Sequence, residues 1–387
     1  MTGYRHNGAV RTLSDRRQRG ALWLWTTCLL AMMGPGHANA DFTLGAPVNL
    51  GPAINTPATE AGVRISVDGL SLCFFRQGPG YPLLEGWIVT RATQHDPWGT
   101  PVSLGPWGDP ASVYKSIRVM PSLTTADGLE LYFHEEGRPG SYGGIDLWML
   151  KRAATDADWD SCVNLGSVVN SSADEMCPAI SSDGLELYFS GGIRTGKKYV
   201  RPGGYGLSDL WVTKRATRND PWGTPVNLGP VVNSASQDER PYLSADGLVL
   251  FFDSQRAGGY GLCDIHMTRR ATRLDAWGEP INLGPLVNSA IVEEFACVSP
   301  DGSTLYWDGA AVGAYNDLWQ ASITPIVDFN ADDKADLVDL VMLIEDWGKS
   351  KSVCDIGPMP WGDGKVDIED LKVFMTYYEK ENPPAKP

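Results

Sequence analysis

Histidine is scarce in this sequence. Five occur in 387 residues, and only His95, His134 and His266 lie beyond residue 40. None of these three stands in a nucleophile or metal-binding pattern, and the sequence has no G-x-S-x-G, H-E-x-x-H or phosphate-loop motif. Basic residues are also in deficit, since the formal net charge is −15. This charge argues against a surface for nucleic-acid phosphates, which would need a basic stripe.

Long apolar runs are rare as well. The run ALWLWTTCLLAMM (21–33) is short for a membrane span. Residues 1–40 hold five Arg against one Asp and end in HANA, before Asp41. A basic region, a short apolar core and an A-x-A ending are typical of a secretory signal peptide, removed here after Ala40. We therefore expect an exported protein, periplasmic, cell-surface or extracellular, without a membrane span.

Cysteines occur beyond residue 40, but their spacings do not indicate a disulfide framework. No C-x-x-C pair suggests zinc. Export would permit disulfides, yet Cys73 and Cys177 lie in apolar, strand-like runs, where buried thiols are an equal alternative.

Glycine and aromatic residues are abundant, with 43 Gly, 14 Trp and 14 Tyr, and they form a repeat. An Asp-Gly turn precedes an apolar strand such as GLELYFS (184–190) in every copy. Elements like DLWVT (209–213) and WGTPVNLG (222–229) follow. Period-2 patterning between Gly/Asp turns predicts four short strands per repeat of about 55–60 residues. The turns start at Asp68, Asp127, Asp183, Asp246 and Asp301.

The two ends of the repeat region complement each other. The fifth repeat stops after DLWQASI (317–323) without its last strand, whereas FTLGAPVNLG (42–51) is that strand with no repeat before it. The sequence therefore predicts an all-β fold, a five-bladed β-propeller over residues 41–325. Its N-terminal strand closes the last blade and removes an exposed sheet edge.

The repeat unit S-x-D-G-x-x-L-Y-F, seen most clearly as SPDGSTLYW (299–307), resembles the WD40-like (PD40, TolB-type) β-propeller repeat. The resemblance covers about 280 residues because the repeat recurs five times. It implies the fold much more than a function.

Two patterns repeat on the face that carries the GGYG connections. They supply carboxylates, Arg and Tyr that could surround the channel mouth and bind a sugar, a peptide or a carboxylate. The alternative is that these residues fasten blades and cap turns, which their repetition favours. A Tyr-x3-acid spacing is expected to be a turn clasp, and Trp98, Trp222 and Trp277 blade packing. The candidate ligand-face residues are Glu60, Arg118, Glu175, Asp238, Glu293, Arg138, Tyr142, Arg201, Tyr205, Arg256 and Tyr260.

Evidence for an enzyme is thin. The repeated carboxylates leave open a propeller glycoside hydrolase or lyase. Such an enzyme needs carboxylates in different environments, to serve as acid and base, and near-identical blades do not supply them. The sequence therefore favours a non-catalytic protein that binds protein or carbohydrate.

Residues 328–340, DFNADDKADLVDL, begin a different kind of sequence. Calcium takes six to eight oxygen ligands, and a 12-residue loop before a helix delivers them at positions 1, 3, 5, 7, 9 and 12. Leu337, Leu340, Val341 and Ile344 have the spacing of an apolar helix face. The ligands predicted for this first loop are Asp328, Asn330, Asp332, Lys334 through its carbonyl, Asp336 and Asp339.

A second, altered copy follows at 354–375. Here Asp363, Lys365, Asp367 and Asp370 fit positions 5, 7, 9 and 12. If GPMP (357–360) is an insertion, Asp355 supplies the first ligand across a 16-residue loop.

Two such loop–helix units in tandem resemble the dockerin module, over residues 326–380, with 381–387 as a tail. The resemblance implies bound Ca²⁺ and docking to a cohesin-like or other cell-surface protein through Leu337, Val338, Ile368 and Glu369. Asp333 stands where the family has Gly, which lowers the expected calcium affinity. The alternative is that the module caps the propeller of its own chain.

Overall fold

The computed structural model of the protein describes residues 42–77, 85–106, 124–160, 162–192, 201–310, 316–350 and 352–383. The predicted signal peptide (1–40) and the end of the predicted tail lie outside these ranges, as does Arg118. Within the described ranges, no helix is long and apolar enough to cross a membrane.

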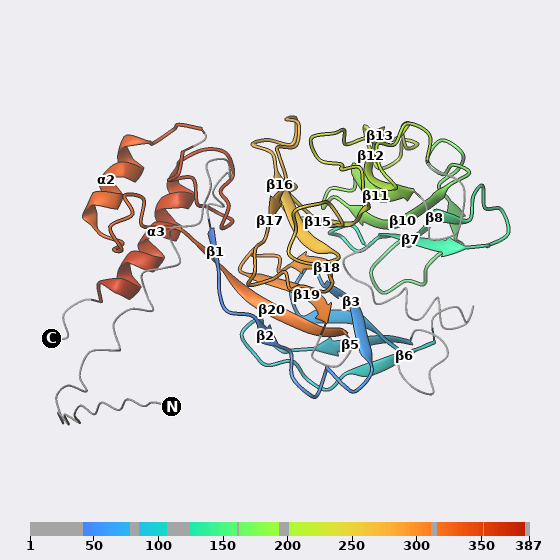
Figure 1. Cartoon of the computed structure of the whole chain (residues 1–387), viewed down its shortest axis with the longest axis horizontal. Helices are drawn as coiled ribbons and strands as arrows, with labels where there is room; N and C mark the ends of the chain where they lie inside the picture. Colours follow the sequence, from blue (N-terminus) through green and yellow to red (C-terminus); the bar gives the residue numbers. More distant parts are fainter. Residues whose placement is uncertain are drawn as a thin grey trace, which may run out of the picture. The chain divides into compact units, whose positions relative to one another are not determined.

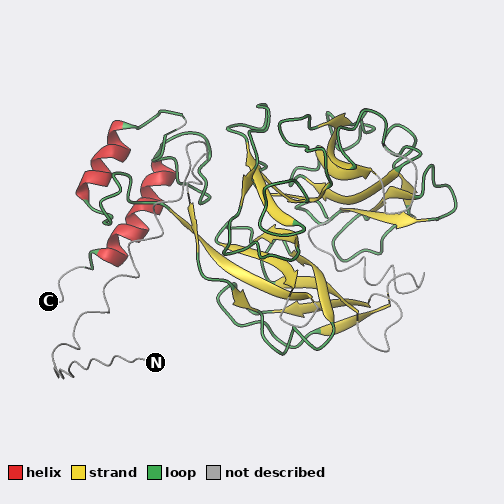
Figure 2. Ribbon diagram, viewed as in Figure 1, coloured by secondary structure: helices red, strands yellow, loops and turns green. Residues whose placement is uncertain are grey.

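The described strands form five antiparallel sheets, one for each sequence repeat (Figures 1 and 2). The first blade comprises β3 (Thr59–Ile65), β4 (Ser71–Gln77), β5 (Glu85–Thr90) and β6 (Val102–Pro106). The second comprises β7 (Glu130–Glu136), β8 (Ile145–Lys151) and β9 (Val163–Asn164). Its predicted first strand falls mostly on residues outside the described ranges.

The third and fourth blades each have four strands in sequence order. The third comprises β10 (Asp174–Ile180), β11 (Glu186–Gly192), β12 (Ser208–Lys214) and β13 (Val226–Asn227). The fourth comprises β14 (Asp238–Leu243), β15 (Val249–Ser254), β16 (Asp264–Arg269) and β17 (Ile281–Asn282). The prediction of a five-bladed all-β propeller is confirmed.

The fifth blade is closed by the N-terminal end of the described chain. Its own strands are β18 (Glu293–Val298), β19 (Thr304–Ala310) and β20 (Asn316–Pro325). Both β1 (Phe42–Leu44) and β2 (Val48–Asn49) pair antiparallel with β20, with Phe42 opposite Pro325 and Val48 opposite Gln320. The predicted closure by the N-terminal strand is therefore confirmed.

The Asp-Gly turns hold each first hairpin together. In the third blade the Ser181 hydroxyl donates to Asp183 at 2.7 Å and accepts from the backbone N–H of Glu186 at 2.9 Å. Gly184 takes φ +75°, a left-handed conformation that costs a glycine little. The turn chemistry of the sequence thus fixes the register of the hairpin that follows.

Apolar clusters join neighbouring blades. One combines Leu72 and Phe74 of the first blade with Tyr306 of the fifth, and another joins the third and fourth blades. Trp222 packs edge-on against Tyr132 of the preceding blade, at a centroid distance of 5.8 Å. The equivalent Trp98 and Trp277 contact Tyr306 and Tyr188, so the predicted role of these Trp residues in blade packing is confirmed.

The last described ranges contain two helices, α2 (Leu337–Glu345) and α3 (Ile368–Glu381). They share an apolar cluster that contains Val327, Leu343, Ile356 and Phe374. Each helix begins with a capping box, in which Asp336 or Asp367 is the N-cap and the Asp three residues later bonds back.

Candidate functional site

The repeated carboxylates Glu60, Glu175, Asp238 and Glu293 stand at the start of the first strand of their blades and are buried. Each accepts a hydrogen bond from the backbone N–H four residues earlier, at 2.6–3.0 Å. Burial raises the pKa of Glu175, against the opposing effect of Ser171 and Arg201. These acids thus hold the entry into each first strand.

Among the described residues, three of the four carboxylates form ion pairs within their own blades. Arg76 contacts Glu60 at 2.6 Å, and Arg201 contacts Glu175 at the same distance. Arg256 contacts Asp238 at 2.8 Å. Arg138, in the second blade, pairs instead with Glu135 at 2.7 Å. These guanidinium groups and carboxylates are brought together inside blades and satisfy one another there.

The Asn that precedes each of these acids joins two blades. Asn233 accepts from the backbone N–H of Leu210 at 2.8 Å and donates to its carbonyl at 3.0 Å, across the boundary between the third and fourth blades. Asn55, Asn170 and Asn288 make the same pair of bonds to the third strand of the blade before them. The repeated Asn therefore fastens blades.

The Tyr residues of the GGYG connections lie at the surface. Asp209 accepts from the backbone N–H groups of Tyr205 and Gly206, which confirms the predicted turn clasp. Asp146 and Asp264 do the same for Tyr142 and Tyr260. All three Tyr side chains are more than half exposed. Leu207 and Leu262 are also exposed, which adds apolar area to the same connections in the third and fourth blades.

A feature that the sequence analysis missed lies in the first strands, which contact one another from blade to blade. Each has a register shift two residues after its acid, where the chain takes a positive φ. The residues there are Gly62, Cys177, Arg240 and Phe295.

The backbone N–H of each shifted residue donates to a side chain of the blade that precedes it in the ring. Arg240 donates to Ser190 at 2.9 Å and Phe295 to Asp253 at 3.2 Å. Gly62 donates to Asp308 at 3.0 Å, and Cys177 to His134 at 3.3 Å. The shifted residue differs in all four of these blades, and its acceptor is His134, Ser190 or one of the aspartates Asp253 and Asp308.

Charged side chains cluster around the shifted residue of the fourth blade, Arg240. Arg240 lies 3.0 Å from Glu294, 3.3 Å from Asp253 and 3.6 Å from Glu239. Its guanidinium group stands 4.7 Å from the centroid of the Phe295 ring. Burial opposes the charge of Arg240, but the Glu294 and Asp253 carboxylates override it and raise the pKa of Arg240.

Two fully buried carboxyl groups belong to this charged cluster. Burial raises the pKa of Asp253 well above its ordinary range, although Arg240 opposes the shift. Burial and the nearby Glu294 raise the pKa of Asp308 to about 8. Among the described residues, Asp253 Oδ1 has no hydrogen-bond partner. Asp308 is therefore expected to keep its proton to a higher pH than an exposed aspartate does.

One signal in the sequence could have located this cluster. The residue after each L-Y-F strand is Phe75, His134, Ser190, Asp253 or Asp308, so the repeat varies there, whereas the residue just before it is always aromatic. A binding or catalytic site breaks the symmetry of a repeat protein, whereas framework residues recur in each copy. The varying residue after the L-Y-F strand is therefore the better candidate for a functional position.

The first C-terminal loop closes around its own carboxylates. Asp328 accepts from the backbone N–H groups of Asp332 at 3.1 Å and Asp333 at 2.8 Å. Asp339 accepts from Phe329, Asn330 and Asp336. Asn330 donates to Asp332 at 3.2 Å. Asp328 and Asn330, at positions 1 and 3, thus both accept from the backbone N–H of Asp332.

The second loop repeats this network despite its different length. Asp355 accepts from the backbone N–H groups of Asp363 at 2.9 Å and Gly364 at 2.8 Å. Asp370 accepts from Ile356, Gly357 and Asp367. Burial, opposed by the N–H bonds, together with Asp370 raises the pKa of Asp355 to about 6. Asp355 thus occupies the place that Asp328 has in the first loop.

Position 6 is left-handed in both loops. Asp333 has φ +66° and Gly364 has φ +96°. A non-glycine residue in this region carries a conformational cost, which Asp bears better than most residues. The departure of Asp333 from the expected Gly is therefore a change of residue without a change of backbone.

The residues predicted to dock a partner are accessible. Leu337, Val338 and Ile368 are each at least half exposed, and Val341 and Ile344 extend the apolar surface along α2. Glu369 forms a short-range ion pair with Lys372 at 2.7 Å. Helix α2 thus presents a continuous apolar surface.

Comparison with known proteins found no matching family model and no matching curated protein. The structure is similar to TolB from Acinetobacter baumannii, with a TM-score of 0.41 and 12% identity, covering 70% of this chain and 56% of that one. The chain thus spans little more than half the length of that TolB. It is also similar to a thermostable family-43 glycoside hydrolase (TM-score 0.45, 11% identity, 72% and 92% covered). A third similar structure is an α-L-arabinofuranosidase from Lactobacillus brevis, with a TM-score of 0.43 and 14% identity, covering 72% of this chain and 93% of that one. At such identities the similarity is one of fold alone, and the strand order of this chain is that of a five-bladed β-propeller.

Proposed function

We propose that the protein is an exported, non-catalytic binding protein with two parts. Residues 41–325 are the propeller, which binds carbohydrate or protein, and residues 326–380 are a dockerin-like module that attaches the protein to a partner in a calcium-dependent way. The observation that carries the proposal is the shared network of the two C-terminal loops, with a carboxylate at position 1, a left-handed residue at position 6 and Asp at position 12.

The donor set of both loops suits calcium, because it consists of oxygen atoms only. Calcium would neutralise the gathered carboxylates and fix each loop against the helix that follows it. The first loop would use Asp328, Asn330, Asp332, Asp336, Asp339 and the carbonyl of Lys334. The second would use Asp355, Asp363, Asp367, Asp370 and the carbonyl of Lys365.

The partner is a cohesin-like or other cell-surface protein, bound through α2. The support is the exposed apolar surface of this short helix, which includes Leu337 and Val338. An apolar surface of this kind on a polar chain marks an interaction site. Ile368 and Glu369 stand at the equivalent places of the second unit.

The docking proposal is tested by immobilising residues 41–387 and exposing them to cell-envelope and secreted fractions, with calcium or with chelator. We expect one calcium-dependent partner, which the Leu337→Asp/Val338→Asp variant fails to retain. The matched control is Leu274→Asp, at an exposed leucine of the propeller. Equal capture with chelator, or by the helix variant, would show that this docking does not occur.

The propeller contacts its ligand through the exposed residues of the GGYG connections. Tyr205 and Tyr260 supply aromatic faces, which stack on sugars or apolar groups, and Leu207 and Leu262 enlarge the same surface. A glycan panel is the test. Tyr205→Ala and Tyr260→Ala should lower binding at least tenfold, about 1.4 kcal/mol, while unfolding changes by less than about 0.5 kcal/mol.

A glycoside hydrolase or lyase is the second candidate, because Asp253 and Asp308 are carboxyl groups in a different environment from the repeated acids. A carboxyl group that stays protonated near neutral pH can act as a general acid. Turnover on the same glycan panel, lost in Asp308→Asn and kept in Asp156→Asn at an exposed site, would replace the non-catalytic proposal with this one.

A further inference from the structure

The boundary between the third and fourth blades shows how one blade normally covers the turn of its neighbour. Arg273, in the outer connection of the fourth blade, pairs with Asp183 in the Asp-Gly turn of the third at 2.6 Å. Trp277, from the same connection, packs edge-on against Tyr188 at 5.9 Å. Arg218 and Trp222 of the third blade do the same for Asp127 and Tyr132 of the second.

In the described part of the chain, the fifth blade has no outer connection that covers the fourth. Its chain leaves the sheet at the end of β20, and its outer strand comes from the N-terminal side. Ile323 stands where Arg270 stands in the fourth blade, and Val249 where Glu186 stands in the third. Arg270 and Glu186 form a buried ion pair at 2.7 Å, whereas Ile323 and Val249 belong to an apolar cluster. This boundary has therefore exchanged a charged pair for an apolar one.

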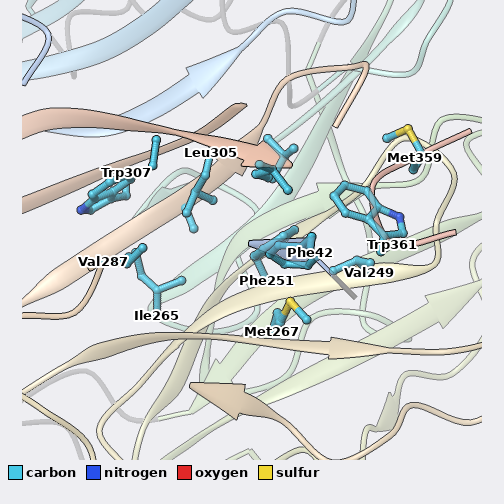
Figure 3. Packing of buried hydrophobic residues seen from close by; sticks show 14 residues of the cluster. Phe42, Val249, Phe251, Ile265, Met267, Val287, Leu305, Trp307, Met359 and Trp361 are labelled. Carbon is cyan, nitrogen blue, oxygen red and sulfur yellow. The ribbon is translucent and has the colours of Figure 1, made fainter. Parts of the chain in front are cut away.

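Trp361, from the C-terminal part of the chain, occupies the place of the missing connection (Figure 3). Its indole Nε1 donates to Asp246 Oδ2, in the Asp-Gly turn of the fourth blade, at 2.8 Å. Its ring packs edge-on against Phe251, the counterpart of Tyr188, at a centroid distance of 6.4 Å. Trp361 is 1% exposed. One side chain thus makes the contacts that Arg273 and Trp277 make one blade earlier.

The neighbours of Trp361 fit closely against the same boundary. Arg269 donates to the carbonyl of Trp361. A Cβ at Gly302 would lie 2.7 Å from Pro360 Cδ, and a Cβ at Gly364 would lie 2.6 Å from the carbonyl oxygen of Ala271. Both glycines are required by close approach as well as by their positive φ. The contact is therefore built from both sides.

The closing strand of the propeller takes part in this contact. Phe42, at the start of β1, packs edge-on against Trp361 at a centroid distance of 6.3 Å. Met359 belongs to the same apolar cluster. The docking segment, Met359–Gly364, therefore touches the strand on which closure of the fifth blade depends.

We propose that the docking segment is the missing outer connection of the fifth blade, and that calcium in the second loop stabilises the closed propeller. The calcium part rests on the proposed function. Asp355 accepts from Asp363 and Gly364, directly after Trp361, so the residues that would hold calcium also fix the docking segment. The second unit is thus committed to its own propeller, and the first loop with α2 serves the external partner.

Hydrogen exchange of residues 41–387, with calcium and with chelator, resolves the elements concerned. In the parent protein, calcium should slow exchange in β1 and β20 at least tenfold while β10–β12 stay unchanged. Trp361→Ala should abolish this effect and lower the melting temperature of the propeller by about 5–10 °C. The matched control is Trp347→Ala, at an exposed tryptophan just after α2, which should leave both unchanged.

Trp361→Phe guards against a variant that fails to fold, because it keeps the aromatic contact and loses only the bond to Asp246. It should speed exchange in β1 and β20 by an intermediate amount. If both Trp361 variants exchange at the same rate as the parent in β1 and β20, the docking segment does not stabilise the closed propeller. Calcium binding by direct titration without protection of β1 and β20 would overturn the linkage and leave the calcium proposal standing. Failure to bind calcium at all would overturn the linkage together with that proposal.

Discussion

The backbone N–H of Gly62 in the first blade donates to Asp308 Oδ1 in the fifth at 3.0 Å. This bond crosses the boundary at which the propeller closes on itself, and Asp308 is fully buried. Asn316 donates to the other carboxyl oxygen at 3.1 Å. The closure of the propeller thus includes a titratable group in addition to the pairing of β1 and β2 with β20.

Asp308 makes stability depend on pH. Its folded-state pKa of about 8 lies above the ordinary value of 3.8, so the folded protein binds the proton more tightly than the unfolded chain. Stability should therefore fall as pH rises from about 4 to about 8, by at most about 1.4 kcal/mol per unit, and level off above. Asp308→Asn should become progressively more stable than the parent over this range, as measured by urea unfolding.

The control for the pH dependence is Asp156→Asn, at an exposed carboxylate. This variant should run parallel to the parent at every pH. If Asp308→Asn also runs parallel, Asp308 does not hold its proton in the folded protein.

The Asn residues that fasten blades should contribute measurably to the free energy of unfolding. Asn233→Ala would leave the backbone N–H of Leu210 without its buried partner, while the carbonyl of Leu210 keeps its bond from the N–H of Leu228. We expect a loss of about 1–3 kcal/mol in urea unfolding, which is the cost of one buried unsatisfied group. Asn219→Ala, at an exposed site of the third blade, should cost less than about 0.5 kcal/mol. Equal effects of the two changes would contradict the assigned role.

The two left-handed loop residues predict opposite outcomes for reciprocal substitutions. Asp333→Gly should stabilise the C-terminal helices by about 0.5–1 kcal/mol, because glycine tolerates φ +66° at little cost. Gly364→Asp should destabilise them by about 2 kcal/mol or more, since its Cβ would meet the carbonyl of Ala271. Chemical unfolding followed by helical circular dichroism measures both. Changes of the same sign would show that the loops do not share this backbone.

The repeat made most of the propeller predictable. Asp-Gly turns, alternating strands and the unmatched strand at 42–51 each report local chemistry, and together they define the blades and their closure. The repeated Trp and the Tyr-x3-acid spacing likewise act within a blade or on its neighbour. The fold and the residues that hold the blades together could therefore be predicted from sequence pattern and spacing.

Two features were not within reach, for physical reasons. The positive φ of Cys177, Arg240 and Phe295 belongs to residue types that seldom adopt it, so only the assembled blades reveal the register shifts. Trp361 directly follows the possible GPMP insertion of the second loop, yet it bonds to Asp246, 115 residues earlier. Contacts across such a separation leave no periodic signal in the sequence.

The most direct test of the account is a calcium titration of residues 41–387 by calorimetry, with two variants of the first loop. Asp328→Ala removes a carboxylate at position 1, whereas Lys334→Ala keeps the backbone carbonyl that position 7 would supply. We expect calcium binding by the parent, unchanged binding by Lys334→Ala, and the loss of one site in Asp328→Ala. No heat of binding in the parent protein, or equal binding by parent and Asp328→Ala, would contradict it.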